Sequence, residues 1–241
     1  MTAALVFSTA LVAGVVQSIT GFGCAVVMMV VFPHLFDMLH APALTSAIAF
    51  GLAVGLAWRF RAHVEARKAL PMAAAYVLMS TIAINLARGL DLERLTAVFG
   101  LFLILLSAYY LFVPGGMSVG TSLAAGLPWA VAAGVTGGLF SIGGPLLVIY
   151  FLNASKSKES YIANLQMIYL CSNFFNTLTR TIHGIYTWEL VPLTLLGIVG
   201  INLGKVAGLR VLDRIDIARM KKLVYLLIGI SGIINVAEYF L

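Results

Sequence analysis

Two glycine-rich stretches interrupt long apolar runs of this chain, and their residue types suit them to binding a small ligand. The first is Thr20-Gly21-Phe22-Gly23 and the second is Ser141-Ile142-Gly143-Gly144-Pro145. A helix that stops and restarts at such residues exposes backbone N–H groups and a partial positive charge at its new start. Pro145 fits the first turn of a restarted helix, where its missing N–H costs nothing. Because helix starts bind sulfate and phosphate, the two stretches predict an anion site.

Polar side chains within the apolar runs could complete such a site. In the run 160–183 they recur on one helical face, and they are Gln166, Asn173, Asn176, Thr177 and Arg180. Thr45 and Ser46 offer hydroxyl groups from the run 40–60, while Thr20 and Ser141 offer them beside the glycines. Each type of polar side chain could also have a role other than ligand binding. Amides could bond between helices, hydroxyl groups could bond to their own helix, and Arg180 could extend to the membrane interface.

The composition places these residues in a membrane. Apolar types make up 61% of the 241 residues and charged types only 10%, whereas soluble domains carry about 25% charged residues. With a window of about 20 residues, the length that crosses a bilayer, the sequence predicts eight apolar segments. They cover 3–33, 40–60, 69–88, 92–113, 122–152, 160–183, 188–209 and 216–240. The sequence therefore predicts an all-α polytopic protein, multi-pass in the cell inner membrane.

The two halves of the sequence also resemble each other. At an offset of 120 residues, Gly23 coincides with Gly143 and Ala43 with Ala163. The repetition predicts a first membrane repeat at 1–112, a linker at 113–121 and a second repeat at 122–241. Glycines can simply allow membrane helices to pack closely. Their recurrence at equivalent places instead favours broken helices, which in duplicated transporters meet at a site between the repeats.

The distribution of Lys and Arg predicts how the segments cross. Cytoplasmic joints carry the excess of these residues. If all eight segments cross fully, ten of the 15 lie on one side; if segments 3–33 and 122–152 enter and return on the same side, twelve do. The second arrangement fits better, so we expect a re-entrant first segment and three full crossings in each half. An odd number of crossings makes the repeats inverted, with both chain ends in the periplasm.

The two glycine-rich motifs resemble a known family. Gln17-Ser18-Ile19-Thr20-Gly21-Phe22-Gly23 and the stretch from Gly137 to Pro145, in a duplicated chain of this length, are similar to the TauE/SafE family of sulfite exporters, also called TSUP. The first motif departs from the pattern, because Cys24-Ala25 stands where Gly-Pro would complete it. The resemblance implies a transporter of sulfite, sulfonates or related small sulfur-containing or organic anions, and it implies no enzyme activity. Together with the inverted repeats, it predicts transport by alternating access.

Other functions have weaker support. An intramembrane serine hydrolase could use Ser141 with His183, and a membrane subunit that transports nothing is a further alternative. The net charge of +6 does not indicate nucleic acid, because the basic residues fall in short joints. His34, His40 and His63 lack metal-ligand spacing, and Cys24 and Cys171 lie in apolar runs, so we expect no metal, cofactor or disulfide. A coupling proton and a homo-oligomer stay open.

Overall fold

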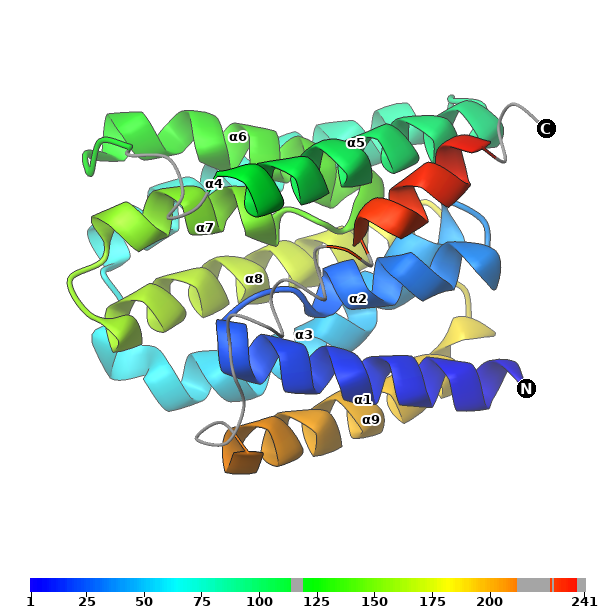
Figure 1. Cartoon of the computed structure of the whole chain (residues 1–241), viewed down its shortest axis with the longest axis horizontal. Helices are drawn as coiled ribbons and strands as arrows, with labels where there is room; N and C mark the ends of the chain where they lie inside the picture. Colours follow the sequence, from blue (N-terminus) through cyan, green and yellow to red (C-terminus); the bar gives the residue numbers. More distant parts are fainter. Residues whose placement is uncertain (114–118, 212–225, 227, 238–241) are drawn as a thin grey trace.

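The helices of this protein lie side by side along one axis (Figure 1). The computed structural model describes residues 1–113, 119–211, 226 and 228–237, and over these residues the regular structure is entirely helical. The first half contains α1 (Thr2–Thr20), α2 (Cys24–Val31), η1 (Phe32–His34), α3 (His40–Phe60), η2 (Arg61–His63), α4 (Ala66–Ala87) and α5 (Leu92–Phe112). The second half contains α6 (Leu123–Phe140), α7 (Gly144–Ala154), α8 (Lys158–Ile182) and α9 (Leu190–Val211), followed by the short helix Ile228–Ala237.

Short polar side chains start several of these helices. The side chain of Asp91 accepts hydrogen bonds from the backbone N–H groups of Glu93 and Arg94 at the start of α5. Ser122 and Ser157 begin α6 and α8 in the same way. Each satisfies a backbone donor that the first helical turn leaves unpaired. The helix boundaries therefore follow the joints between the apolar segments.

Both predicted breaks are confirmed. The first follows α1, where Gly21 has φ 82° and Gly23 has φ 102°, a backbone region that glycine enters without steric cost. The second follows α6 at Ser141. Among the described residues, Ser141 is the one non-glycine residue with a positive φ, which is 58°. In the left-handed region the chain cannot continue a right-handed helix, so it turns. Helices α2 and α7 then start after Gly23 and Gly143.

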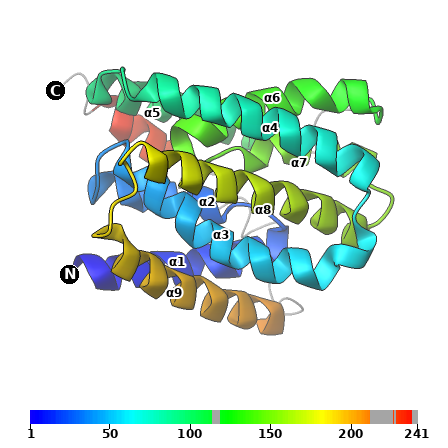
Figure 2. The same ribbon diagram turned by 180° about the vertical axis from the view of Figure 1, so that it is seen from behind.

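After each break the chain turns back (Figures 1 and 2). Helix α1 starts at the end of the molecule marked N, and α2 runs back towards that end. Helix α6 starts at the opposite end, and α7 runs back towards its own starting end (Figure 1). The two broken segments are therefore hairpins that enter from opposite ends of the helix bundle.

Among the described residues, six helices are long and apolar enough to cross a membrane, namely α1, α3, α4, α5, α6 and α9. Helices α2 and α7 and the helix Ile228–Ala237 are shorter. The predicted polytopic all-α class is thus confirmed. Helix α8 is 25 residues long but carries the predicted polar stripe, which lowers its hydropathy. The predicted segment 216–240 and linker 113–121 lie partly outside the described residues.

Some glycines serve close helix packing. Helices α1 and α9 pack together, as do α4 and α6. A side chain at Gly204 would collide with the backbone of Leu11, and one at Gly134 would lie 2.8 Å from Met79 Cβ. The alternative interpretation of glycine as a packing residue therefore holds for these positions, which lie within continuous helices, whereas the glycines of the two breaks lie in turns.

Candidate functional site

A small cavity lies between the two breaks. Its volume is about 30 Å³, room for about two water molecules. Both hairpins contribute to its wall, together with α3, α4 and α8, and the lining residues are Gln17, Gly23, Cys24, Ala25, Val26, Ala49, Tyr76, Ser141, Ile142, Gly143, Gly144, Pro145, Tyr169, Ser172 and Asn173. Backbone that is irregular at this depth is tolerated where it lines such a cavity. Both breaks thus line one cavity between the two halves, which is where the sequence predicts an anion site.

The second break supplies unpaired donors to this cavity. In the part of the chain that the structure describes, the backbone N–H groups of Gly143 and Gly144 have no hydrogen-bond partner. The hydroxyl group of Tyr169 is buried and also lacks one. A Cβ atom on Gly144 would lie 2.8 Å from that hydroxyl oxygen, so the hydroxyl group lies against the start of α7. An unpaired buried donor beside a helix N-terminus is the arrangement that receives an anion.

At the first break, several hydrogen-bonding groups already have partners within the protein. The Gln17 side chain accepts a hydrogen bond from the backbone N–H of Cys24 at 3.0 Å, which occupies the first donor of α2. The Thr20 hydroxyl group donates to the carbonyl of Val16 at 2.9 Å. Gln166 donates from its amide to the Gly21 carbonyl at 3.2 Å. Much of the polar chemistry at this break therefore holds the turn itself.

The two breaks are held by equivalent contacts from the other half. Ser46 of α3 hydrogen-bonds to Ser141 at 2.7 Å, and Gln166 of α8 bonds to Gly21. With the offset of 120 residues, Ser46 corresponds to Gln166, and Gly21 corresponds to Ser141. Each half therefore uses the same position to hold the break of the other half.

Arg180 is buried behind the second break. Its side chain donates to Ser46 Oγ at 2.8 Å, to Ser141 Oγ at 3.4 Å and to the Gly138 carbonyl at 2.6 Å. The residue is only 2% exposed, so the interpretation that it extends to the membrane interface is wrong. Among the described residues no Asp or Glu forms an ion pair with it. A positive charge thus lies behind Ser141, which lines the cavity, and its hydrogen-bond partners are neutral oxygen atoms.

The structure brings together part of the predicted site. The predicted residues that line the cavity are Gly23, Ser141, Gly143, Gly144, Pro145 and Asn173. The remaining ones lie outside its lining, and they are Thr20, Gly21, Phe22, Thr45, Ser46, Gln166, Asn176, Thr177 and Arg180. Asn176 donates to the Gly137 carbonyl, which supports the second break. The Ser141 hydroxyl group donates to the Pro42 carbonyl at 2.8 Å and has no proton left for a ligand.

The sequence did not predict two tyrosines of the cavity wall. Tyr76 and Tyr169 line the cavity from α4 and α8 and are 3% and 7% exposed. Tyrosine is common in membrane helices and is counted here among the hydrophobic residue types, so only their place on the buried helical face could have indicated them. In α8 that face also carries Ser172 and Asn173, next to Tyr169.

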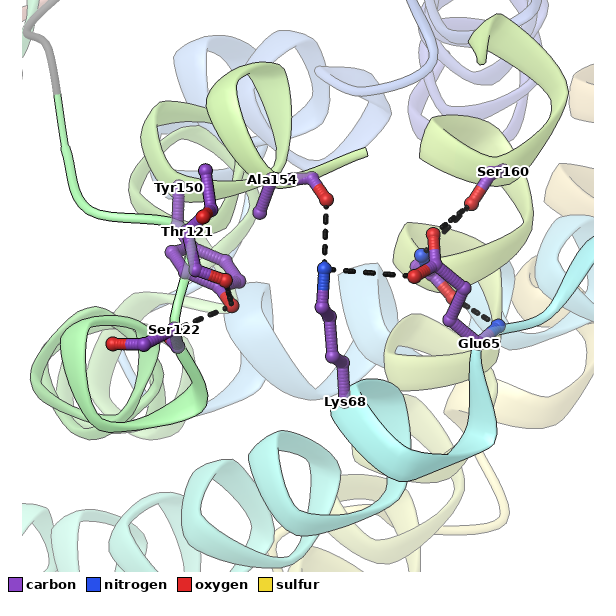
Figure 3. Close-up of polar contacts among 8 residues, drawn as sticks. Glu65, Lys68, Thr121, Ser122, Tyr150, Ala154 and Ser160 are labelled. Atoms are coloured by element: carbon purple, nitrogen blue, oxygen red, sulfur yellow. Dashed lines mark hydrogen bonds and ion pairs between the residues drawn. The ribbon is translucent and has the colours of Figure 1, made fainter. Parts of the chain in front are cut away.

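A polar network joins three helices at the end of the molecule where α4 and α8 begin (Figure 3). Lys68 Nζ donates to the Ala154 carbonyl at 2.9 Å and lies 3.5 Å from the Glu65 carboxylate. Glu65 accepts a hydrogen bond from Ser160, and its backbone N–H donates to the Asn164 side chain at 2.8 Å. These contacts join the first half to both α7 and α8. We call Glu65, Lys68, Ser160 and Asn164 the Glu65 network.

The serine hydrolase alternative gains no support from its two residues. Ser141 bonds to Pro42 and Ser46, as described above. His183 Nδ1 lies 2.8 Å from Arg88 Nη1 at the end of α8. A base must lie within hydrogen-bond reach of the nucleophile that it activates, and this one bonds elsewhere.

Comparison with known proteins identifies the chain. The family described as sulfite exporter TauE/SafE matches residues 6–234. No curated protein and no solved structure matches. The matched range covers the cavity, both breaks and the six membrane-length helices, apart from residues 2–5 at the start of α1. The chain therefore belongs to the TauE/SafE family of sulfite exporters, which are membrane transporters of sulfur-containing anions.

Proposed function

We propose that this protein moves sulfite, sulfonates or related small anions across the cell inner membrane by alternating access between two inverted repeats. The observation that carries the proposal is Arg180, a buried guanidinium without an acidic partner among the described residues, next to a cavity with unpaired donors. A charge deep in a membrane protein is costly unless another charge or polar groups compensate it. An anion in the cavity would supply the compensation.

The arrangement of the hairpins supports the inverted repeats. They enter from opposite ends, and Ser46 and Gln166 make equivalent contacts to the break of the opposite half. In transporters with such repeats, one element moves against the other around a fixed central site. The cavity that would serve as this central site is small, with a volume of about 30 Å³.

The contacts that would keep the cavity closed differ in chemistry between the two ends of the helix bundle. At one end the Glu65 network joins α4 to α7 and α8. Towards the other end, Arg180 joins α8 to Ser46 of α3 and to the second break. Helix ends rich in Lys and Arg surround the Glu65 network, so we assign that end to the cytoplasm. Opening one closure at a time would expose the cavity to each side in turn.

The direct test is flux in proteoliposomes. Purified protein would be reconstituted, and uptake of sulfite would be compared with thiosulfate, methanesulfonate and small carboxylates, with and without a pH gradient. We expect saturable sulfite uptake that is absent from empty liposomes. A gradient-dependent rate would add a coupling proton to the proposal. Uptake of none of these anions by well-folded protein would overturn it.

A further inference from the structure

A second, apolar groove lies on the outer surface of the helix bundle. Its volume is about 540 Å³, and it lies between the last turns of α3, η2 and the middle of α8. It shares no lining residue with the central cavity. On this side of the molecule α3 lies between α8 and α9 (Figure 2). The apolar residues of its walls include Val54, Trp58, Val64, Met167 and Leu170.

The chemistry of the groove changes along α3. Val54 and Trp58 are four residues apart, which places them on one helical face, and Arg61 follows three residues later in η2. From the interior of the span towards its end, the wall is therefore aliphatic, then aromatic, then cationic. Tryptophan prefers the level of the lipid headgroups, so Trp58 marks the membrane interface. A phospholipid has the same order, with acyl chains in the interior and a phosphate at the interface.

Three basic side chains lie in or beside the groove. Arg61 donates to the Trp58 carbonyl at 2.7 Å, and its Cζ atom lies 4.3 Å from the centre of the indole ring. A Cβ atom on Gly55, in the groove wall, would lie 3.1 Å from Lys205 Nζ of α9. Arg59 is near enough for its charge to repel that of Lys205. Among the described residues, none of the three cations forms an ion pair.

Basic residues at the end of a span often do no more than extend to the interface. Two observations distinguish this group. The Arg61 guanidinium is held over the Trp58 ring, which fixes it in the groove wall. Lys205 lies within the span Leu190–Arg210, where a charge needs a compensating partner. A negative charge in the groove would compensate Lys205 and Arg61 together.

We propose that this groove binds an anionic phospholipid of the bilayer. An acyl chain would pack against Val54, Met167 and Leu170, and the phosphate would accept hydrogen bonds from Arg61. The groove lies beside the Glu65 network, at the end of the molecule that we assign to the cytoplasm, and the cytoplasmic leaflet carries anionic lipids. The lipid would contact α3 of the first half and α8 of the second half at once.

Trp58 lines the groove and can report lipid binding through its fluorescence. The protein has three tryptophans, so Trp129→Phe with Trp188→Phe leaves Trp58 alone. This variant would be reconstituted in phosphatidylcholine with a small fraction of lipid whose acyl chains carry bromine, which quenches indole on contact. We expect brominated phosphatidylglycerol to bind more tightly than brominated phosphatidylcholine, by about fivefold for each basic residue that contributes.

Three further substitutions test the two parts of the groove. Arg61→Gln should reduce the preference for phosphatidylglycerol by about fivefold. Arg94→Gln removes the same charge at the start of α5, outside the groove, and should leave the preference unchanged. Val54→Phe keeps every charge but narrows the apolar part, so it should weaken quenching by brominated phosphatidylglycerol. Bilayers without bromine give the reference fluorescence of each variant.

Equal quenching by the two brominated lipids, or full preference in Arg61→Gln, would overturn the headgroup site. Unchanged quenching in Val54→Phe would mean that anionic lipids gather around the basic surface without entering the groove, which also rejects the proposal. Absence of quenching by either lipid would mean that something else, such as a second copy of the chain, covers Trp58. The measurement requires no transport, so the proposed function stands or fails separately. Thermal unfolding in detergent confirms that each variant is folded.

Discussion

The guanidinium of Arg180 has two roles that substitution can separate. Its hydrogen bonds hold Gly138 and Ser46 in place, and its charge lies behind the cavity wall. Lysine keeps the charge but lacks the planar fork that reaches two acceptors at once. Glutamine keeps some hydrogen bonding but removes the charge. The two substitutions therefore test geometry and charge in turn.

We predict that Arg180→Gln raises the sulfite concentration for half-maximal uptake by about tenfold or more, because a buried charge that compensates the anion is lost. Arg180→Lys should lose less affinity and show a lower thermal stability. Uptake in proteoliposomes and unfolding in detergent measure the two effects. Arg88→Gln is the control, since this arginine is exposed and contacts His183. Parental affinity in Arg180→Gln would remove Arg180 from the anion site.

Two neighbouring glycines should respond differently to alanine. At Gly144 the new methyl group would meet the Tyr169 hydroxyl oxygen, the mobile end of a side chain. At Gly143 it would meet the Ala133 carbonyl and the ring of Tyr76. We predict that Gly144→Ala folds normally but weakens sulfite uptake, whereas Gly143→Ala lowers stability by about 1–3 kcal/mol through overpacking. Equal stability with equal uptake loss in both variants would contradict this distinction.

Only some residues of the candidate site could be predicted from the sequence, namely those that act through local backbone geometry. Glycine and proline change backbone geometry wherever they stand, so both breaks followed from local sequence. Tyr76 and Tyr169 carry no such signal, because their place in the cavity wall comes from packing between α4 and α8. The same holds for Arg180, whose burial depends on the approach of Ser46 and Gly138 from distant parts of the chain.

At the scale of helices, the Glu65 network connects elements that must separate if this end opens. Lys68 and Glu65 are each 24% exposed, and ion pairs with this exposure contribute only about 0–1 kcal/mol. Such a contact can hold a closed state without making opening slow. The sequence did not indicate it, since its residues are far apart in the chain and belong to ordinary charged joints.

We predict that Lys68→Met exposes the cavity from the network's side by breaking the contact with Ala154. Cys24 lines the cavity and can report the opening in a Cys171→Ser background. Its alkylation by a membrane-impermeant methanethiosulfonate, added from that side, should accelerate by up to about fivefold. Lys158→Met removes the same charge from the start of α8, outside the network, and should leave the rate unchanged. An unchanged rate in Lys68→Met means that other contacts close this end.

The pH dependence of the Glu65 network has a defined direction. The hydrogen bond from Ser160, aided by the charges of Lys68 and Lys156, lowers the pKa of Glu65 below its ordinary value of 4.5, although burial opposes the shift. A lowered pKa in the folded state stabilises the network above pH 4.5, and this contribution is lost as pH falls through the lowered value. The stability difference between the parental protein and Glu65→Gln should be constant from pH 6 to 8 and shrink below pH 4.5. Unfolding curves in detergent measure it, and a change near pH 7 would contradict it.

At the scale of the whole molecule, the sequence predicted the helical class and both hairpins because hydropathy and breakers are local. The number of membrane-length helices was less predictable. Helix α8 was predicted as an apolar segment, yet its polar face excludes it from the six, because that face turns towards the cavity and the other half of the protein. A helix face covered by protein does not need the composition of a face in contact with lipid.

The orientation of the whole chain is the remaining prediction. If the hairpins return to the sides from which they enter, the joint at Ala62 and the joint at Lys156 face the cytoplasm, and the joint at Leu90 faces the periplasm (Figure 1). If both hairpins instead crossed fully, Ala62 and Lys156 would lie on opposite sides. Single cysteines at the three positions, in a background without Cys24 and Cys171, would be labelled in whole cells by an impermeant maleimide. We expect labelling at position 90 alone, and periplasmic labelling at just one of positions 62 and 156 would rule out the inverted repeats.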